Sequence, residues 1–114
     1  MALKLVIHVP DSTRYKIALK MGINFLKTKA EGEELLARIL VNAQGIMVLL
    51  ELDEESQKLM EEFISFGGEV HFCRNAMKAF NVPEEKVPPK CQVVPAGIRA
   101  LVEWQDEGFR YVRA

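Results

Sequence analysis

The first apolar segment of the chain, Leu3–Val9, constrains the fold more than any other feature. Its sequence, LKLVIHV, is an almost continuous run of apolar and β-branched residues rather than a clean alternation of apolar and polar ones. Such a run is typical of a strand covered on both faces, as in a parallel sheet. Pro10 ends the strand, and Asp11 and Ser12 are residue types that cap the first turn of a helix.

The rest of the chain repeats this change from strand to helix, which implies crossover connections and a mostly parallel sheet covered on both sides. We therefore predict one α/β domain over residues 1–114, a three-layer α/β/α sandwich with a mostly parallel five-stranded sheet. The segment 46–52 is ambiguous between a strand and a buried helical turn. We expect helices near residues 12–27, 54–66 and 98–107, and strands near 3–9, 35–42, 69–73, 91–94 and 109–112.

Composition narrows the class of protein. The chain has 114 residues, 49% hydrophobic and 27% charged, which suits one soluble globular domain. Its net charge of -1 gives no electrostatic reason to expect nucleic acid or an anionic membrane as a partner. The apolar start is too short for a signal peptide or a membrane span, so the expected location is the cytoplasm.

The segment 69–80 contains the residue of greatest chemical interest. Val70 and Phe72 favour a strand, Ala76 and Phe80 fall at helical spacing, and no Gly or Pro separates the two halves. Cys73 therefore lies where a strand passes directly into a helix, beside free backbone N–H groups that stabilise an anion. Such a position favours a reactive thiolate. The alternative is that Cys73 is a small buried apolar residue.

Ligands of open α/β sheets bind at the carboxyl ends of the strands. Five polar side chains are expected to gather there, and Cys73 is the strongest nucleophile among them. Asp11 and Ser12 are interpreted as helix caps. His71 shares a strand face with Cys73, but two ligands are only half of a zinc site, so we expect neither a metal nor another cofactor. The five residues are His8, Asp11, Asn42, Cys73 and Asn75.

Cys91 is predicted to be structural. It begins the fourth strand, whereas Cys73 ends the third, so the two lie at opposite edges of a parallel sheet. Four residues of strand separate them by about 13 Å or more, which exceeds the ~7 Å between α-carbons that a disulfide spans. The chain has two cysteines and no Cys-x-x-Cys pair, and in a reducing compartment both are expected to be thiols.

Several motifs resemble those of the DsrE/DsrF-like family, over the whole domain. The most specific are a Cys-x-Asn-Ala motif at 73–76, Val-Pro-Ala-Gly at 94–97 and a Gln-x-Glu-Gly-aromatic-x-Tyr tail at 105–111. His-Val-Pro-Asp at 8–11 and the segment 40–45, LVNAQG, add to the likeness. The resemblance implies a parallel five-stranded α/β/α fold with strand order 4-3-2-1-5, assembly into trimers or hexamers, and sulfur carried as a persulfide on a cysteine.

By this resemblance we expect an intracellular sulfur-trafficking protein, a persulfide carrier or sulfurtransferase-like protein, in which Cys73 matches the sulfur-carrying cysteine. The expected partners are copies of the same chain and a sulfur donor or acceptor protein. His71 or His8 is a candidate for assisting proton movement. Two alternatives remain open: an oligomeric module that binds a small anion without turnover, and a structural subunit with an inert Cys73. The expected binding residues around Cys73 are His8, Asn42, Arg74, Asn75 and Gly97.

Overall fold

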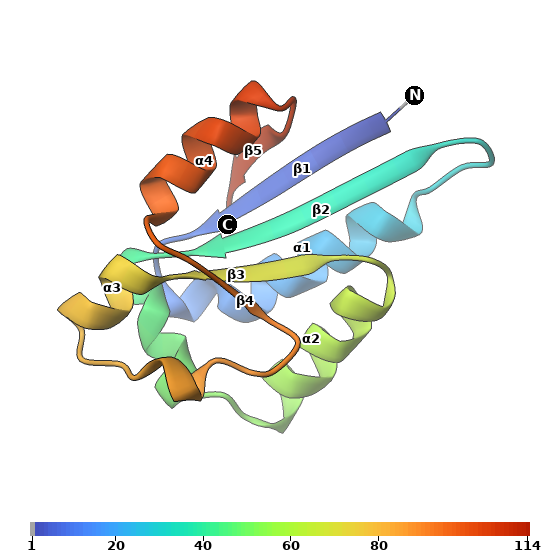
Figure 1. Cartoon of the computed structure of the whole chain (residues 1–114). Coiled ribbons are helices and arrows are strands. Elements are labelled where there is room, and N and C mark those ends of the chain that lie inside the picture. The colour runs from blue at the N-terminus through green and yellow to red at the C-terminus, as the bar shows by residue number, and fades with distance from the viewer. Residues whose placement is uncertain (1) are drawn as a thin grey trace.

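A computed structural model describes residues 2–114, and its centre is a five-stranded sheet (Figure 1). The strand order is β4-β3-β2-β1-β5, and every neighbouring pair is parallel. The predicted α/β fold and its strand order are therefore confirmed. The strands are β1 (Ala2–Val9), β2 (Glu34–Val41), β3 (Glu69–Cys73), β4 (Gln92–Val94) and β5 (Arg110–Arg113).

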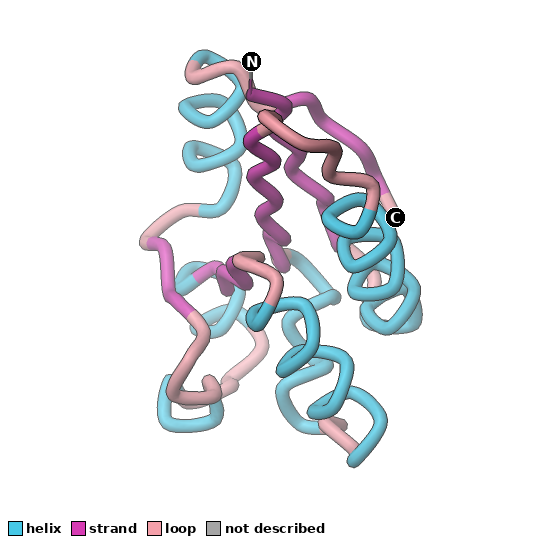
Figure 2. The backbone as a smooth tube through the Cα atoms, turned by 90° about the vertical axis from the view of Figure 1, so that its right-hand side faces the viewer, coloured by secondary structure: helices cyan, strands magenta, loops and turns pink. Residues whose placement is uncertain are grey.

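The helices follow the strands as predicted, and Figure 2 shows them on both sides of the sheet. The long helical segment predicted after the first strand consists of a 3-10 turn that continues into an α-helix. Within the described residues no helix is long and apolar enough to cross a membrane. The helical elements are η1 (Ser12–Arg14), α1 (Tyr15–Lys27), η2 (Ala43–Leu50), α2 (Glu54–Ser65), α3 (Arg74–Ala79), η3 (Glu84–Lys86) and α4 (Gly97–Asp106).

Two hydrophobic clusters lie on opposite faces of the sheet. The larger one joins alternate strand residues such as Ile7 and Phe72 to Leu19 of α1 and Phe63 of α2. The smaller one joins the intervening strand residues Val6 and Leu40 to Ala100, Leu101 and Trp104 of α4, with Phe109. Burial on both faces explains why the strands read as nearly continuous apolar runs.

The ambiguous segment 46–52 is not a strand. Most of it belongs to the 3-10 helix η2, which begins directly after β2. Ala43, the first residue of η2, has a φ of 48°, which turns the chain out of the strand direction. Ile46, Val48 and Leu49 are buried in the larger cluster. These apolar side chains therefore extend the core from a helix outside the sheet. The intrinsic propensities of the residues do not distinguish this helix from a strand.

Helix α2 begins and ends at the residues that the sequence indicates. The Asp53 carboxylate accepts a hydrogen bond from the Ser56 amide at 2.8 Å. Lys16 donates to the same carboxylate at 2.6 Å, and this contact, with the capping bond, lowers the pKa of Asp53 to about 2. Gly67, with a φ of 96°, follows the last turn. A glycine tolerates this left-handed conformation without the steric cost that a Cβ brings.

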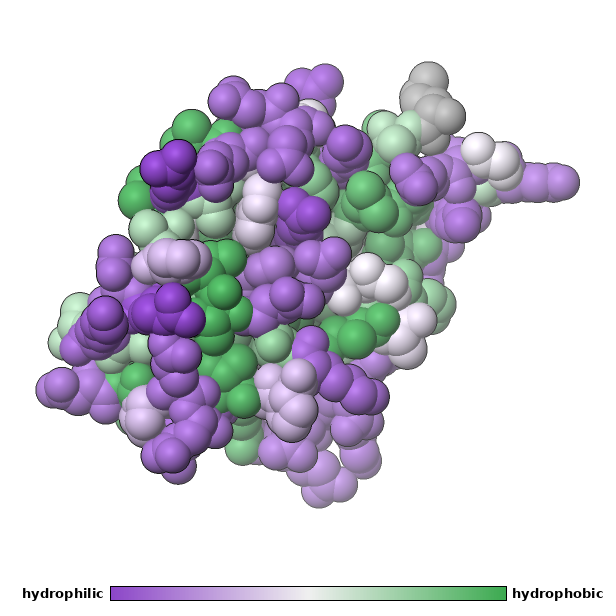
Figure 3. Space-filling model, viewed as in Figure 1, coloured by the Kyte–Doolittle hydropathy of each residue, from purple (hydrophilic) through white to green (hydrophobic). Residues whose placement is uncertain are grey.

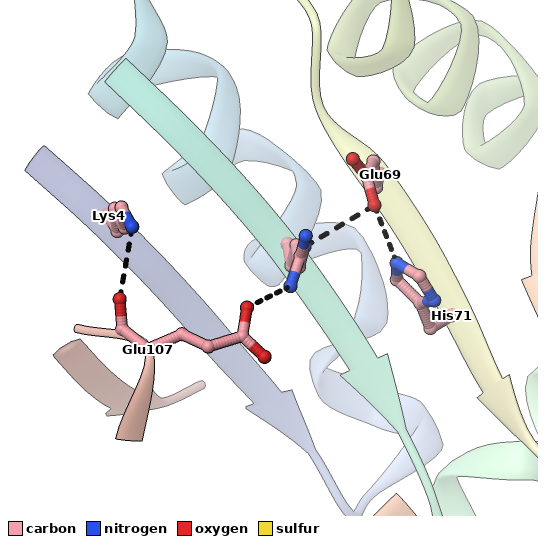
Figure 4. A network of polar contacts seen from close by, with 5 residues as sticks. Lys4, Glu69, His71 and Glu107 are labelled. Carbon is pink, nitrogen blue, oxygen red and sulfur yellow. Dashed lines mark hydrogen bonds and ion pairs between the residues drawn. The ribbon is translucent and has the colours of Figure 1, made fainter. Parts of the chain in front are cut away.

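A charged network covers part of the sheet beside α4. The Arg38 guanidinium carbon lies 4.9 Å from the centroid of the Trp104 ring and 4.4 Å from that of Phe109. It also pairs with Glu69 at 3.4 Å and Glu107 at 4.0 Å. Figure 4 shows how these acidic side chains lie around the strands. The Arg38 guanidinium is thus enclosed by two aromatic rings and two carboxylates on the face of the sheet that α4 covers.

Candidate functional site

The site lies where β1, β2 and β3 end and α4 begins. Cys73 is the last residue of β3 and the N-cap of α3. Its Sγ accepts a hydrogen bond from the Ala76 amide at 3.4 Å and a second from the Gly97 amide at 3.2 Å. The residue is 5% exposed. Two backbone donors from two helices therefore converge on one buried sulfur, which confirms that this cysteine lies at a strand-to-helix junction.

Gly97 is the residue that lets these elements meet. It is the first residue of α4 and is buried. A Cβ at this position would lie 3.0 Å from Cδ1 of Leu40, 3.2 Å from Cβ of Cys73 and 3.3 Å from Cβ of Asn42. All three distances are tighter than ordinary van der Waals contact. The absence of a side chain at Gly97 therefore allows the start of α4 to pack directly between Cys73 and Asn42.

His8 and Asn42 are joined at the same edge of the sheet. Nε2 of His8 lies 2.7 Å from Oδ1 of Asn42, and Nδ1 of His8 lies 2.5 Å from the hydroxyl of Tyr111. An amide oxygen only accepts, so Nε2 carries the proton and Nδ1 of the neutral ring accepts from the tyrosine. Burial is the main cause that lowers the pKa of His8, and the charge of Arg113 acts in the same direction. The neutral ring is favoured because burial outweighs the Asn42 hydrogen bond, which raises the pKa.

Tyr111 belongs to the site, although the sequence identifies it only as part of the family motif at 105–111 and not as a site residue. It lies in β5, where its partner in the β1 register is Val6. Val6 and His8 are two residues apart and so share one face of β1. The predicted order, with the fifth strand beside the first, is the signal that could have placed Tyr111 near His8. The exposed fraction of Tyr111 is 43%, so this end of the hydrogen-bonded chain reaches solvent.

The structure does not bring Arg74 and Asn75 to the sulfur. The Arg74 guanidinium donates to the Glu84 carboxylate, which raises the pKa of Arg74. Its charge is therefore shared with a neighbouring carboxylate. Asn75 is exposed on α3, and its side chain makes no hydrogen bond to the described residues. Of the six expected site residues, the four that lie together are Cys73, Gly97, Asn42 and His8.

Asp11 caps the first helical turn, as predicted, whereas Ser12 lies within that turn and is not its cap. The Asp11 carboxylate accepts from the Thr13 amide at 2.9 Å and from its hydroxyl at 2.8 Å, so it caps η1. These bonds lower the pKa of Asp11. Ser12 exchanges two hydrogen bonds with the Gln44 side chain, at 2.9 and 3.0 Å. These contacts fix the loop after β1 against the loop after β2 and so hold the edge that carries His8 and Asn42.

His71 lies in the network beside α4. Its Nε2 lies 2.9 Å from the Glu69 carboxylate, and its ring meets the Trp104 ring edge-on with centroids 4.8 Å apart. Burial lowers the pKa of His71 more than the Glu69 contact raises it. Nδ1 is buried without a hydrogen-bond partner among the described residues. The contacts of His71 therefore belong to the packing of α4.

Both cysteines are free thiols in the structure. Cys91 precedes β4 and lines a cleft of about 460 Å³ between α2 and the Pro88–Pro89 segment. Burial raises the pKa of the Cys91 thiol to about 11. Cys91 is therefore a neutral thiol near neutral pH.

The model of the DsrE/DsrF-like family matches residues 5–114. No curated protein matches significantly. The solved structure of a protein of unknown function, MTH1491 from Methanobacterium thermoautotrophicum, superposes with a TM-score of 0.79 at 19% sequence identity. The match covers 99% of this chain and 98% of MTH1491. The crystal structure of the ychN protein from E. coli superposes with a TM-score of 0.73 at 13% identity, and the match covers 98% of this chain and 99% of ychN. These structures share the fold.

Proposed function

The chain belongs to the DsrE/DsrF-like family, a family generally associated with sulfur relay, and on that premise we propose that it carries sulfane sulfur as a persulfide on Cys73. The observation that carries the proposal is the pair of amide hydrogen bonds, from Ala76 and Gly97, to the Cys73 sulfur. Amide donors aimed at a sulfur favour its anionic form, and the thiolate is the species that attacks sulfur.

Loading is a single displacement. The Cys73 thiolate attacks the terminal sulfur of a donor persulfide, R–S–SH. The S–S bond of the donor breaks, R–S⁻ leaves, and Cys73 becomes Cys73–S–SH. The neutral His8 ring and the Tyr111 hydroxyl are hydrogen-bonded to each other at the same edge, and a proton can reach Nδ1 of His8 only when the hydroxyl turns away from it.

One observation favours a different function. Cys73 is 5% exposed, and a donor has to reach its sulfur. An inert Cys73 in a structural or small-anion-binding subunit is the competing proposal, and accessibility of the sulfur separates it from the sulfur carrier.

The test is intact-protein mass spectrometry after exposure to polysulfide or thiosulfate. A persulfide carrier gains one sulfur atom on wild-type protein and on Cys91→Ser, and none on Cys73→Ser. Circular dichroism of each variant checks that the fold is intact. Gain of sulfur on Cys91 alone, or on neither cysteine, would overturn the proposal in favour of the inert subunit.

Assembly and location are part of the proposal. Large apolar side chains such as Ile46 and Trp104 are buried in the core. Figure 3 shows apolar side chains reaching the surface over α4, where Ile98 is 68% exposed and Val102 56%. Exposed apolar patches mark interfaces. We propose a homo-oligomer, a trimer or hexamer, that acts in the cytoplasm with a sulfur donor or acceptor protein.

A further inference from the structure

In a persulfide on Cys73, the two amide donors of the site reach the inner sulfur atom and make no hydrogen bond to the outer one. The bonds from Ala76 and Gly97 end on Sγ, the atom that belongs to Cys73. In Cys73–S–SH this atom is a neutral bridging sulfur and a weak acceptor. When the persulfide is discharged the same atom becomes a thiolate, and hydrogen bonds to an ionised group are roughly twice as strong.

We infer that the Gly97 amide makes Cys73 a good leaving group, so that the loaded protein hands its outer sulfur to an acceptor thiolate. This inference rests on the proposed function and specifies the group that assists the transfer, the Gly97 amide. The donor bonds strengthen as negative charge develops on Sγ, and only interactions that strengthen in the transition state accelerate a step.

The step balances as a simple exchange. An acceptor thiolate, R–S⁻, attacks the outer sulfur of Cys73–S–SH. The new R–S bond forms while the bond between the outer sulfur and Sγ breaks, and its electron pair remains on Sγ. The products are R–S–SH and the Cys73 thiolate, so no oxidant or reductant is required. A leaving thiolate that is better stabilised departs faster.

Burial of Sγ determines which sulfur is attacked. Attack on the inner sulfur would release hydrosulfide and leave a mixed disulfide, R–S–S–Cys73. That route brings the R group of the acceptor one atom closer to Sγ than loading brings the R group of the donor, and Cys73 is 5% exposed with Gly97 packed against it. The outer sulfur lies one bond farther from the chain. The geometry therefore favours transfer of sulfur over its loss as sulfide.

The decisive variant removes one donor without adding an atom. An ester in place of the Ala96–Gly97 peptide bond replaces the Gly97 N–H by oxygen. Cys91 offers a ligation junction, so a synthetic segment 91–114 can carry the ester into the full chain. The matched control is an ester at Ile98. The Ile98 amide also lies in the first turn of α4, and it donates no hydrogen bond to any of the described residues.

Each protein is loaded with polysulfide, desalted and mixed with glutathione, and the loss of the added sulfur is followed by mass spectrometry. We expect the Gly97 ester to transfer its added sulfur to glutathione about ten-fold more slowly than the Ile98 ester does. A ten-fold change corresponds to the loss of about one hydrogen bond to a charged group. Equal rates would overturn the inference while leaving the persulfide carrier intact.

Product analysis of the wild-type protein gives a second test that needs no variant. Glutathione persulfide with free Cys73 supports the inference, whereas glutathione bound to Cys73 with released sulfide contradicts it. A wild-type protein that never gains sulfur would refute the proposed function, and this inference with it.

Discussion

The Tyr111 hydroxyl lies 2.5 Å from Nδ1 of His8, so a side chain of β5 completes the hydrogen-bonding of a side chain in β1. The other ring nitrogen of His8 is held by Asn42, whose Cβ lies against Gly97 next to Cys73. One hydrogen-bonded chain therefore runs from the exposed edge strand toward the candidate sulfur site.

Replacing Tyr111 by Phe should raise the pKa of His8. The hydroxyl donates to the neutral ring, and a bond to the neutral form disfavours protonation, so its loss makes protonation easier. The pKa of each histidine can be followed by NMR as a function of pH. His71, whose recorded contacts are Glu69 and Trp104, is the internal reference and should not move. An unchanged or lower pKa of His8 in Tyr111→Phe would show that the hydroxyl does not donate to the ring.

Stability should fall as the pH drops below about 6.5. Burial lowers the pKa of both His8 and His71 from the ordinary value of 6.5. Below that pH the unfolded chain binds protons that the folded chain does not, so the free energy of unfolding decreases. The lowered pKa values of Asp11 and Asp53 act only nearer pH 4 and below. Urea unfolding between pH 7.5 and 5 measures the effect, and a His8→Gln, His71→Gln double variant should show a flatter profile.

Cys91 should react with alkylating reagents mainly at high pH. The pKa of Cys91 is raised by burial to about 11, so its alkylation should keep accelerating well above pH 9. At pH 7.5 it should therefore react more slowly than Cys73, whose sulfur accepts two amide hydrogen bonds. Mass spectrometry of each cysteine after timed alkylation gives both profiles. A plateau for Cys91 near pH 9, or faster reaction of Cys91 than Cys73 at pH 7.5, would argue against this assignment.

Packing of Phe63 against glycines should limit substitution in the larger core. A Cβ at Gly22 would lie 2.5 Å from the Phe63 ring, and one at Gly68 would lie 2.4 Å from it. Because Phe63 is fully buried, its ring has little room to move. Gly22→Ala should destabilise the protein by about 1–3 kcal/mol, the usual cost of overpacking. Denaturant unfolding measures it, and Lys20→Ala, on the exposed side of the same helix, is the control.

The exposed apolar side chains of α4 should contribute to assembly. Ile98 and Val102 are four residues apart and lie on one side of that helix. Substituting both with Asp places charge on the patch and should lower the mass measured by light scattering at micromolar concentration. Arg99→Asp, at an exposed neighbouring position, is the charge control. A wild-type protein that is already a monomer would contradict the proposed oligomer.

The fold could be predicted from the sequence because its determinants are local. Continuous apolar runs identify strands covered on both faces, and caps such as Asp53 and stops such as Gly67 bound the helices. The segment 46–52 is ambiguous in the sequence, because an apolar run of that length fits a strand and a buried helical turn equally well.

The site was only partly predictable, because side-chain direction depends on tertiary neighbours. Cys73, Gly97, Asn42 and His8 follow from where the strands end. Arg74 follows Cys73 in sequence, yet its side chain pairs with Glu84 of η3. The chain order gives no indication of that pairing. Tyr111 required the register between β1 and β5, which is fixed by packing of the whole sheet.

The contact between His8 and Tyr111 also bears on how the protein is made. The two residues are 103 positions apart, and β5 follows all its sheet neighbours in the chain. A polypeptide still emerging from the ribosome can pair β1, β2 and β3 before β5 exists. Closing so long a loop comes at an entropic cost that is recovered only once the distant strand docks. A nascent chain therefore holds His8 unpartnered at Nδ1 until synthesis has passed Tyr111, which makes completion of this edge a late event in biogenesis.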